Sequence, residues 1–163
     1  MSANCIDGQG AIIGEKAKHL EESKARSLKI GWIEKGDVLL AHNATVGPVT
    51  IYDGRFGRCL IGTSLTAYRP APNSYTSEFL AAALRADGFQ SQLVKSMSQT
   101  TRNQVPITAQ RDFVLPTPPV EKQRQFSAAC KKAAEIQCRQ IASSEETDVA
   151  FASLQQRAFR GEL

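Results

Sequence analysis

Hydrophobic residues occur in short runs over the first two thirds of the chain and in a helical stripe over the last third. Four short apolar runs are bounded by Asn, Asp, Gly or Pro, which is typical of strands. They are residues 37–41, 49–53, 59–62 and 65–70, and residues 111–119 form a fifth candidate that ends in prolines. We therefore expect a small β-rich part before the C-terminal third.

One good helix is predicted among these strands. Thr76 or Ser77 can cap its N-terminus, Glu78 lies in its first turn, and strongly helix-forming residues follow. Gly88 predicts where this helix stops. A second short helix is predicted over residues 89–95.

The last third of the chain has no Gly or Pro between Pro119 and Phe159. A continuous helix of this length would be roughly 60 Å long, against a diameter of about 35 Å for a globular part of this size. We therefore expect its far end to contact another chain. A competing interpretation is a break at Ser143 and Glu146, which can form a capping box and start the second arm of a hairpin.

Apolar side chains recur along this helix at helical spacing, which places them on one stripe. We predict a partner interface on this stripe, formed by Phe126, Cys130, Ala133, Ile141, Phe151, Leu154 and Phe159.

The net charge of +4 is concentrated in the middle of the chain. Residues 54–111 carry seven basic and two acidic side chains, and six of the seven are arginine. Arginine makes planar, bidentate contacts to phosphate and guanine, which favours a nucleic-acid partner. The alternative is that this excess is an ordinary solvated surface.

Several function classes lack their sequence signals. The two histidines belong to no cluster with metal-ligand spacing, and neither a nucleophile elbow nor a glycine-rich phosphate loop is present. We expect a binding protein rather than an enzyme. The four cysteines have no Cys-x-x-Cys spacing, and we see no signal peptide and no apolar run of about 20 residues. These features favour a soluble, cytoplasmic protein with no membrane contact.

A polar stretch interrupts the apolar pattern between Ser96 and Ile107. Its six consecutive polar side chains are candidates for nucleic-acid contacts: Gln99, Thr100, Thr101, Arg102, Asn103 and Gln104.

The chain resembles the specificity subunit of type I restriction–modification systems over about residues 36–163. The matching segments are GDVLLAHNATVGPV (36–49), LTAYRP (65–70), FLAAALRA (79–86), SQTTRNQVPIT (98–108), FVLPTPPVEKQRQ (113–125) and SLQQRAFRGEL (153–163).

This resemblance implies an α+β fold. Residues 1–118 would form a β-rich target recognition domain with short helices, shortened at its N-terminus, and residues 119–163 a long, coiled-coil-like helix for assembly. The subunit would be non-catalytic and hold no cofactor. It would bind double-stranded DNA and position modification subunits that use S-adenosylmethionine to methylate adenine, and restriction subunits can join the complex. The usual subunit has two such domains and two helices, so this chain resembles a half-subunit that forms a homodimer through its helix. The alternative is that modification subunits cover the stripe of a single copy.

In this family, recognition domains that bind different DNA sequences share a pattern like Ser-x-Thr-x-x-Asn-x-x-Ile. The resemblance therefore implies two groups of residues in the polar stretch, those that match this pattern and those that do not. Thr100 or Thr101 and Asn103 are therefore expected to fix the loop or contact phosphate. Gln99, Arg102 and Gln104 are expected to contact bases.

Lys95, Arg55 and Arg58 complete the predicted DNA-binding set. Two alternatives stay open: a loop that never contacts DNA, and a truncated protein that binds modification subunits without recognising DNA.

Overall fold

The computed structural model describes residues 1–71, 73–97 and 103–161, without the side chains of residues 138, 141, 142 and 145. The chain divides into two compact units, Met1–Gln123 and Arg124–Leu163. Helices and small antiparallel sheets together give the α+β class that the sequence predicts.

The first unit is built around a three-stranded antiparallel sheet in the order β3-β2-β5. Its strands are β2 (Val38–Asn43), β3 (Thr45–Ile51) and β5 (Leu65–Tyr68). The central strand β2 is the most buried, with no accessible surface from Val38 to Ala41, because neighbours cover both of its faces. A second, two-stranded sheet pairs β1 (Trp32–Ile33) with β4 (Cys59–Leu60).

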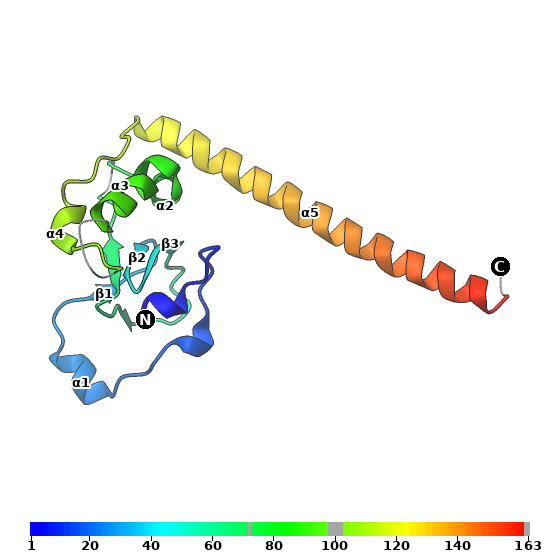
Figure 1. Ribbon diagram of the computed structural model, residues 1–163, viewed down its shortest axis with the longest axis horizontal. Helices are drawn as coiled ribbons and strands as arrows, with labels where there is room; N and C mark the ends of the chain where they lie inside the picture. The colour runs from blue at the N-terminus through cyan, green and yellow to red at the C-terminus, as the bar shows by residue number, and fades with distance from the viewer. Residues whose placement is uncertain (72, 98–102, 162–163) are drawn as a thin grey trace. The chain divides into compact units, whose positions relative to one another are not determined.

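Different helices pack against the two faces of the three-stranded sheet. Helices α2 (Ser77–Arg85) and α3 (Asp87–Met97), green in Figure 1, pack against the face that carries Val38 and Leu40. The short N-terminal helix η1 (Ala3–Cys5) packs against the opposite face, which carries Leu39 and Ala41. This alternation along β2 follows from the two-residue period of a strand.

The predicted cap of α2 is confirmed, because the Thr76 hydroxyl accepts a hydrogen bond from the backbone N–H of Phe79 (3.2 Å). The predicted stop at Gly88 is wrong. The helix ends instead at Arg85, its C-cap residue Ala86 has an extended backbone (ψ 146°), and Gly88 lies in the first turn of α3. The helix therefore stops at an extended residue and not at a left-handed glycine.

Residues 111–119 do not form the predicted strand. Arg111 and Asp112 lie in a turn, residues 113–119 have no regular secondary structure, and the amide side chain of Gln92 takes the role of a neighbouring strand. Its Oε1 accepts from Val114 N and its Nε2 donates to Val114 O, both at 2.9 Å. Phe113 and Leu115 pack against the core on either side of this bond pair. A side chain thus satisfies the backbone that a strand partner would have bonded.

Three short elements complete the first unit: η2 (Gly14–Lys16), α1 (Glu22–Ser27) and α4 (Ile107–Gln110). Within the described ranges, no helix is both long and apolar enough to cross a membrane.

Helix α5 runs without interruption from Val120 to Phe159, 40 residues. The competing hairpin with a break at Ser143 is therefore wrong. Ser143 lies inside the helix, where its carbonyl accepts a hydrogen bond from the Thr147 hydroxyl (2.8 Å). At about 1.5 Å per residue the helix is roughly 60 Å long.

Candidate nucleic-acid interface

The polar stretch predicted to contact DNA is described only at its C-terminal end. Gln99, Thr100, Thr101 and Arg102 lie outside the described residues. Asn103 and Gln104 are described, and they run antiparallel to the end of β2.

The contact between this segment and the β2–β3 hairpin is made by the backbone. Ala44 N donates to Asn103 O (3.0 Å) and Val105 N donates to His42 O (2.9 Å), and these bonds flank an antiparallel bridge between Asn43 and Gln104. Asn103 thus contributes to fixing this segment through its carbonyl. Residues 103–105 extend the sheet beside β2, beyond the point where β5 begins.

Two buried side chains, His42 and Gln110, also form hydrogen bonds with residues 103–105. The His42 Nδ1–H donates to the carbonyl of Val105 (3.0 Å), which also accepts from Gln110 Nε2 (3.2 Å). Gln110 Oε1 in turn accepts from the Tyr68 hydroxyl (2.8 Å). Burial raises the pKa of Tyr68 to about 12, so the phenol keeps the proton that this bond requires. This network connects β2, β5 and α4 beneath the exit of the polar stretch.

Two buried polar atoms near this network have no hydrogen-bond partner among the described residues, His42 Nε2 and Thr66 Oγ1. Nδ1 is the ring nitrogen that bonds Val105 O, and Nε2 is the one that lacks a partner there.

Lys95 comes just before the polar stretch in the sequence. It is exposed in the last turn of α3, two residues before that helix ends at Met97.

The structure does not bring Arg55 and Arg58 to this end of the sheet. Their loop follows Ile51, which pairs with Val38 at the start of β2, whereas Gln104 pairs with Asn43 at its end. At about 3.3 Å per residue, β2 separates these two places by roughly 17 Å. Arg55 and Arg58 therefore follow the opposite end of β2 from the one that Gln104 pairs with.

The local environments of these two arginines differ as well. Arg55 forms an exposed ion pair with Asp53, whose pKa is held below its ordinary value by the side-chain hydrogen bond from Arg55. The Arg58 guanidinium stacks over the Trp32 ring, 4.3 Å from its centroid. A cation on an aromatic face is a recurrent way of holding arginine in place.

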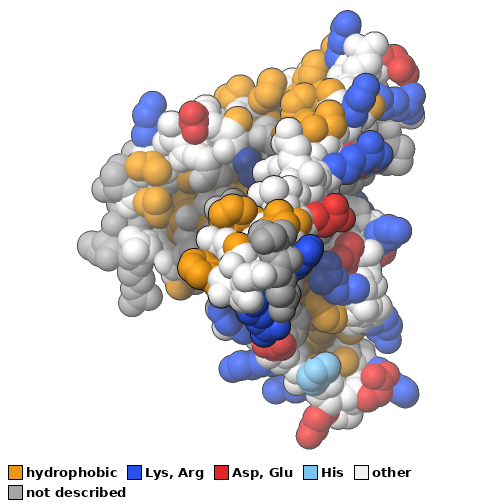
Figure 2. Space-filling model, turned by 90° about the vertical axis from the view of Figure 1, so that its right-hand side faces the viewer, with side chains coloured by type: hydrophobic (Ala, Val, Ile, Leu, Met, Phe, Trp, Pro, Cys, Tyr) orange, Lys and Arg blue, Asp and Glu red, His pale blue; other side chains and the backbone are white. Residues whose placement is uncertain are grey.

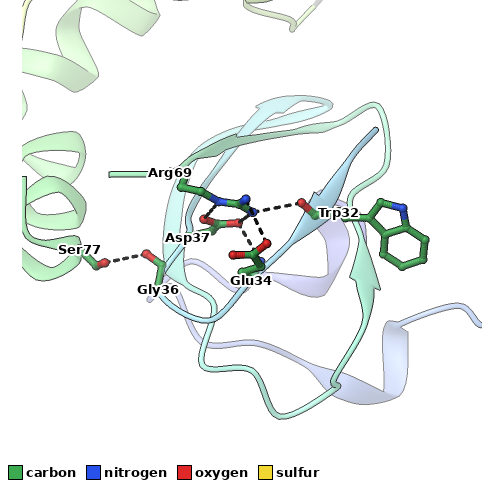
Figure 3. Close-up of polar contacts among 6 residues, drawn as sticks. All are labelled: Trp32, Glu34, Gly36, Asp37, Arg69 and Ser77. Atoms are coloured by element: carbon green, nitrogen blue, oxygen red, sulfur yellow. Dashed lines mark hydrogen bonds and ion pairs between the residues drawn. The ribbon is translucent and has the colours of Figure 1, made fainter. Parts of the chain in front are cut away.

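Two further arginines of the basic middle segment are bonded inside the fold. Arg85 Nη2 donates to the carbonyl of Val49 (2.8 Å). Arg69 forms a two-point contact with Asp37, with Nε 2.8 Å from Oδ1 and Nη2 2.7 Å from Oδ2, and also contacts Glu34 (Figure 3). The arginine excess that favoured nucleic acid in the sequence is thus partly structural.

Asp37 is an almost fully buried carboxylate at the start of β2. Burial, the largest influence, raises its pKa, but the hydrogen bonds from Arg69 and from the Glu34 N–H together outweigh it and hold the pKa below the ordinary value. The same turn is tied to α2, because the Ser77 hydroxyl donates to Gly36 O at 2.7 Å (Figure 3).

The predicted partner stripe lies on α5 in the second unit. Its six described side chains are exposed, and the side chain of Ile141 is outside the description. The largest are Phe126 (39% exposed), Phe151 (61%), Leu154 (50%) and Phe159 (90%). Figure 2 faces the C-terminal end of α5 and shows hydrophobic side chains at its surface among basic ones.

Among the described residues, no group of three or more His, Cys, Asp or Glu side chains is placed to hold a metal ion. The sequence reasoning missed one residue of the candidate interface, Asn43, because its position opposite Gln104 depends on pairing between distant segments. The only signal in the sequence was its place as a turn-forming residue after a short apolar run.

No family model and no curated protein matches this chain. Among solved structures, the chain is similar to one chain of a structure that describes complex assembly and conformational transition of the type I restriction–modification system. The sequence identity is 26%, the TM-score is 0.59, and the likeness covers 84% of this chain and 34% of that chain. This protein thus spans about a third of the length of that relative, and its fold is related to that of a component of a type I restriction–modification complex.

Proposed function

We propose that this chain is a DNA-sequence specificity subunit of a type I restriction–modification methyltransferase complex. The observation that carries this proposal is the likeness to a chain of a type I restriction–modification structure, at 26% identity over 84% of this chain. The resemblance of its sequence segments to specificity subunits agrees with it. On this proposal the chain is not catalytic, and S-adenosylmethionine binds to the modification subunits.

The two units suit the two tasks of such a subunit. Residues 1–118, which lie entirely within the first unit, would form the target recognition domain and contact double-stranded DNA. The second unit is a single long helix with exposed Phe and Leu side chains, suited to assembly with other subunits.

We further propose that the chain acts as a half-subunit. Two copies related by a two-fold axis would pair their α5 helices antiparallel and cover each other's stripe. Fully burying one large apolar side chain gains about 1.5–3 kcal/mol, so covering several of them favours association. Modification subunits, and restriction subunits where present, would join this dimer.

A second candidate function is a protein-interaction module that binds modification subunits without recognising DNA. The observation that favours it is the use of Arg69 and Arg85 inside the fold and the placement of Arg55 and Arg58 at the far end of the sheet.

Salt titration of DNA binding separates the two functions. The full chain is reconstituted with modification subunits, and affinity for duplex DNA is measured from low to high salt. A recognition subunit that neutralises several phosphates loses affinity steeply, with a log–log slope of about −0.9 per phosphate. A complex whose salt slope and affinity equal those of modification subunits alone would contradict the proposed function and favour the interaction module.

Arg102→Ala provides a residue-level test of the same proposal. If Arg102 contacts a base, the variant weakens binding by roughly 1–3 kcal/mol and relaxes specificity at one position. An equal loss on every sequence, with a shallower salt slope, would place Arg102 on phosphate. No loss would remove the polar stretch from the interface.

A further inference from the structure

The backbone and the side chain of Arg58 are both held in place. Arg58 directly precedes β4, and the hydroxyl of the buried Tyr52 donates to the carbonyl of Gly57 (3.0 Å). Leu60, two residues further on, pairs with Trp32, so the two-residue period of a strand turns Arg58 toward the face that carries Trp32. Its guanidinium lies over the Trp32 ring, 4.3 Å from the centroid. An exposed arginine thus has a defined position.

Trp32 is itself fixed by two hydrogen bonds. Its ring Nε1 donates to Leu28 O (2.9 Å), and its carbonyl accepts from Arg69 Nη2 (3.3 Å). The ring is half-buried and points away from Arg69 and Asp37 (Figure 3). The indole therefore offers Arg58 a surface of fixed orientation.

The stack occupies the flat face of the Arg58 guanidinium and leaves its edge to other ligands. All five N–H donors of arginine lie in the guanidinium plane, so a ring against that plane uses none of them. Arg55 differs, because its Nε donates to the carboxylate of Asp53. The cavity beside the Arg58–Trp32 pair is lined by residues between Met1 and Leu60, all of them described, and no carboxylate among them forms an ion pair with Arg58.

A guanidinium plane of fixed orientation suits a planar pair of acceptors. Guanine presents O6 and N7 at its major-groove edge, and arginine binds both at once. A phosphate has oxygens on all sides and is bound well by a mobile lysine, so it gains less from a fixed plane. Trp32 and Arg58 also lie outside the segments by which this chain resembles specificity subunits, so both can differ among proteins that bind different DNA sequences.

We propose that Arg58 contacts a guanine in the major groove and that Trp32 is the positioning residue that holds its guanidinium for this contact; this inference rests on the proposed function. Arg58 belongs to the predicted DNA-binding set, but the guanine and the role of Trp32 follow only from the structure. Holding the side chain in place before binding removes the entropy cost of ordering it.

The experiment uses the full chain reconstituted with modification subunits and a randomised double-stranded DNA library. Bound molecules are sequenced, and the selected motif is compared between wild type and variants. Arg58→Ala removes the donors, Trp32→Ala removes the ring, and Trp32→Phe keeps an aromatic face. Arg26→Ala is the matched control, since Arg26 is an exposed arginine that forms an ion pair with Glu22.

We expect Arg58→Ala to lower the preference for guanine at one position by roughly 5- to 100-fold and to leave the other positions intact. Trp32→Ala should lower the preference at the same position by roughly 2- to 5-fold, as expected for an exposed cation–π contact, and Trp32→Phe should retain most of it. In an Arg58→Ala background, Trp32→Ala should have no further effect, because it acts through Arg58. Arg26→Ala should keep the wild-type motif.

Each failure identifies the step that is wrong. A motif that Arg58→Ala retains overturns this inference and leaves the proposed function standing. An equal loss of affinity on every sequence, with a shallower salt slope, places Arg58 on phosphate and overturns the guanine contact. Full guanine preference in Trp32→Ala overturns the positioning role.

A wild-type complex that selects no motif overturns both the inference and the proposed function. Thermal unfolding of each variant controls for loss of the fold. If Trp32→Ala does not fold, Trp32→Leu replaces it, because leucine keeps an apolar side chain without an aromatic face. An unchanged motif in that variant then refutes the positioning role.

Discussion

Asp37 is the carboxylate on which the start of β2 depends, and Asp37→Asn tests this directly. Its oxygens accept three hydrogen bonds, from Arg69 Nε (2.8 Å), Arg69 Nη2 (2.7 Å) and the Glu34 N–H (2.8 Å). The side chain of Asp37 is only 3% exposed, so water replaces none of these bonds. Asn has the same shape but turns one acceptor into a donor that faces the guanidinium or the N–H.

The expected cost follows from these contacts. A hydrogen bond to a charged group contributes about 1.5–3 kcal/mol, and a buried donor facing a donor forfeits that contribution. Because the Arg69 side chain is half exposed, solvent screens its share. We expect Asp37→Asn to lower the free energy of unfolding by about 2 kcal/mol. For a unit of this size that corresponds to a decrease in melting temperature of about 8 °C.

The pH dependence gives a second readout. The pKa of Asp37 is lower in the folded state than in the unfolded chain, where it is about 3.9. A group with a depressed folded pKa contributes stability that is fully present above the unfolded pKa and is lost as pH falls through the folded pKa. The wild type should therefore lose this contribution below about pH 4, and the Asn variant should lack that part of the slope.

The assay is thermal unfolding of the full chain, followed by circular dichroism from pH 3 to pH 7. Asp53→Asn is the control, because Asp53 forms its ion pair with Arg55 in solvent and should change the melting temperature much less. An Asp37→Asn protein with the wild-type melting temperature and the wild-type pH slope would refute the reasoning.

Two further predictions concern α5. The side chain of Gln123 is fully buried and forms hydrogen bonds with Thr76 N, Ser74 O and Pro118 O. Gln123→Ala should therefore lower the free energy of unfolding by about 2–3 kcal/mol, measured by chemical denaturation. The control is Gln125→Ala, which changes an exposed side chain and should alter the free energy of unfolding by less than about 0.5 kcal/mol. Equal effects of the two would contradict the anchoring role of Gln123. Phe151→Glu combined with Leu154→Glu should convert a dimer to monomers in light scattering, with Gln155→Glu as the control for added charge. A wild-type chain that is monomeric both alone and with modification subunits would end the dimer hypothesis.

Local sequence signals predicted the elements that depend on their own residues. The Thr76 cap and the alanine-rich run after it specify α2, and the absence of Gly and Pro after Pro119 allows α5 to run unbroken. The central strands followed from short apolar runs bounded by turn residues. In the helices the hydrogen bonds join residues close in sequence, and in the strands the side chains alternate with a strict two-residue period.

Tertiary contacts decided what the pattern left ambiguous. Residues 111–119 have the composition of a strand, but Gln92 bonds Val114 in place of a neighbouring strand. The arginine-rich middle looked like a nucleic-acid surface, but Arg69 is held by the buried Asp37. A count of charged residues does not show which of them form ion pairs within the protein.

The candidate interface shows the same division. The sequence alone identified Gln104 within a polar stretch, because amide side chains can recognise adenine. It did not identify Asn43, since the register between the β2 end and residues 103–105 is set by backbone hydrogen bonds across the fold. Composition and periodicity thus determined the central strands and the helices α2 and α5, and only the long-range contacts decided whether residues 111–119 form a strand and which polar side chains lie together.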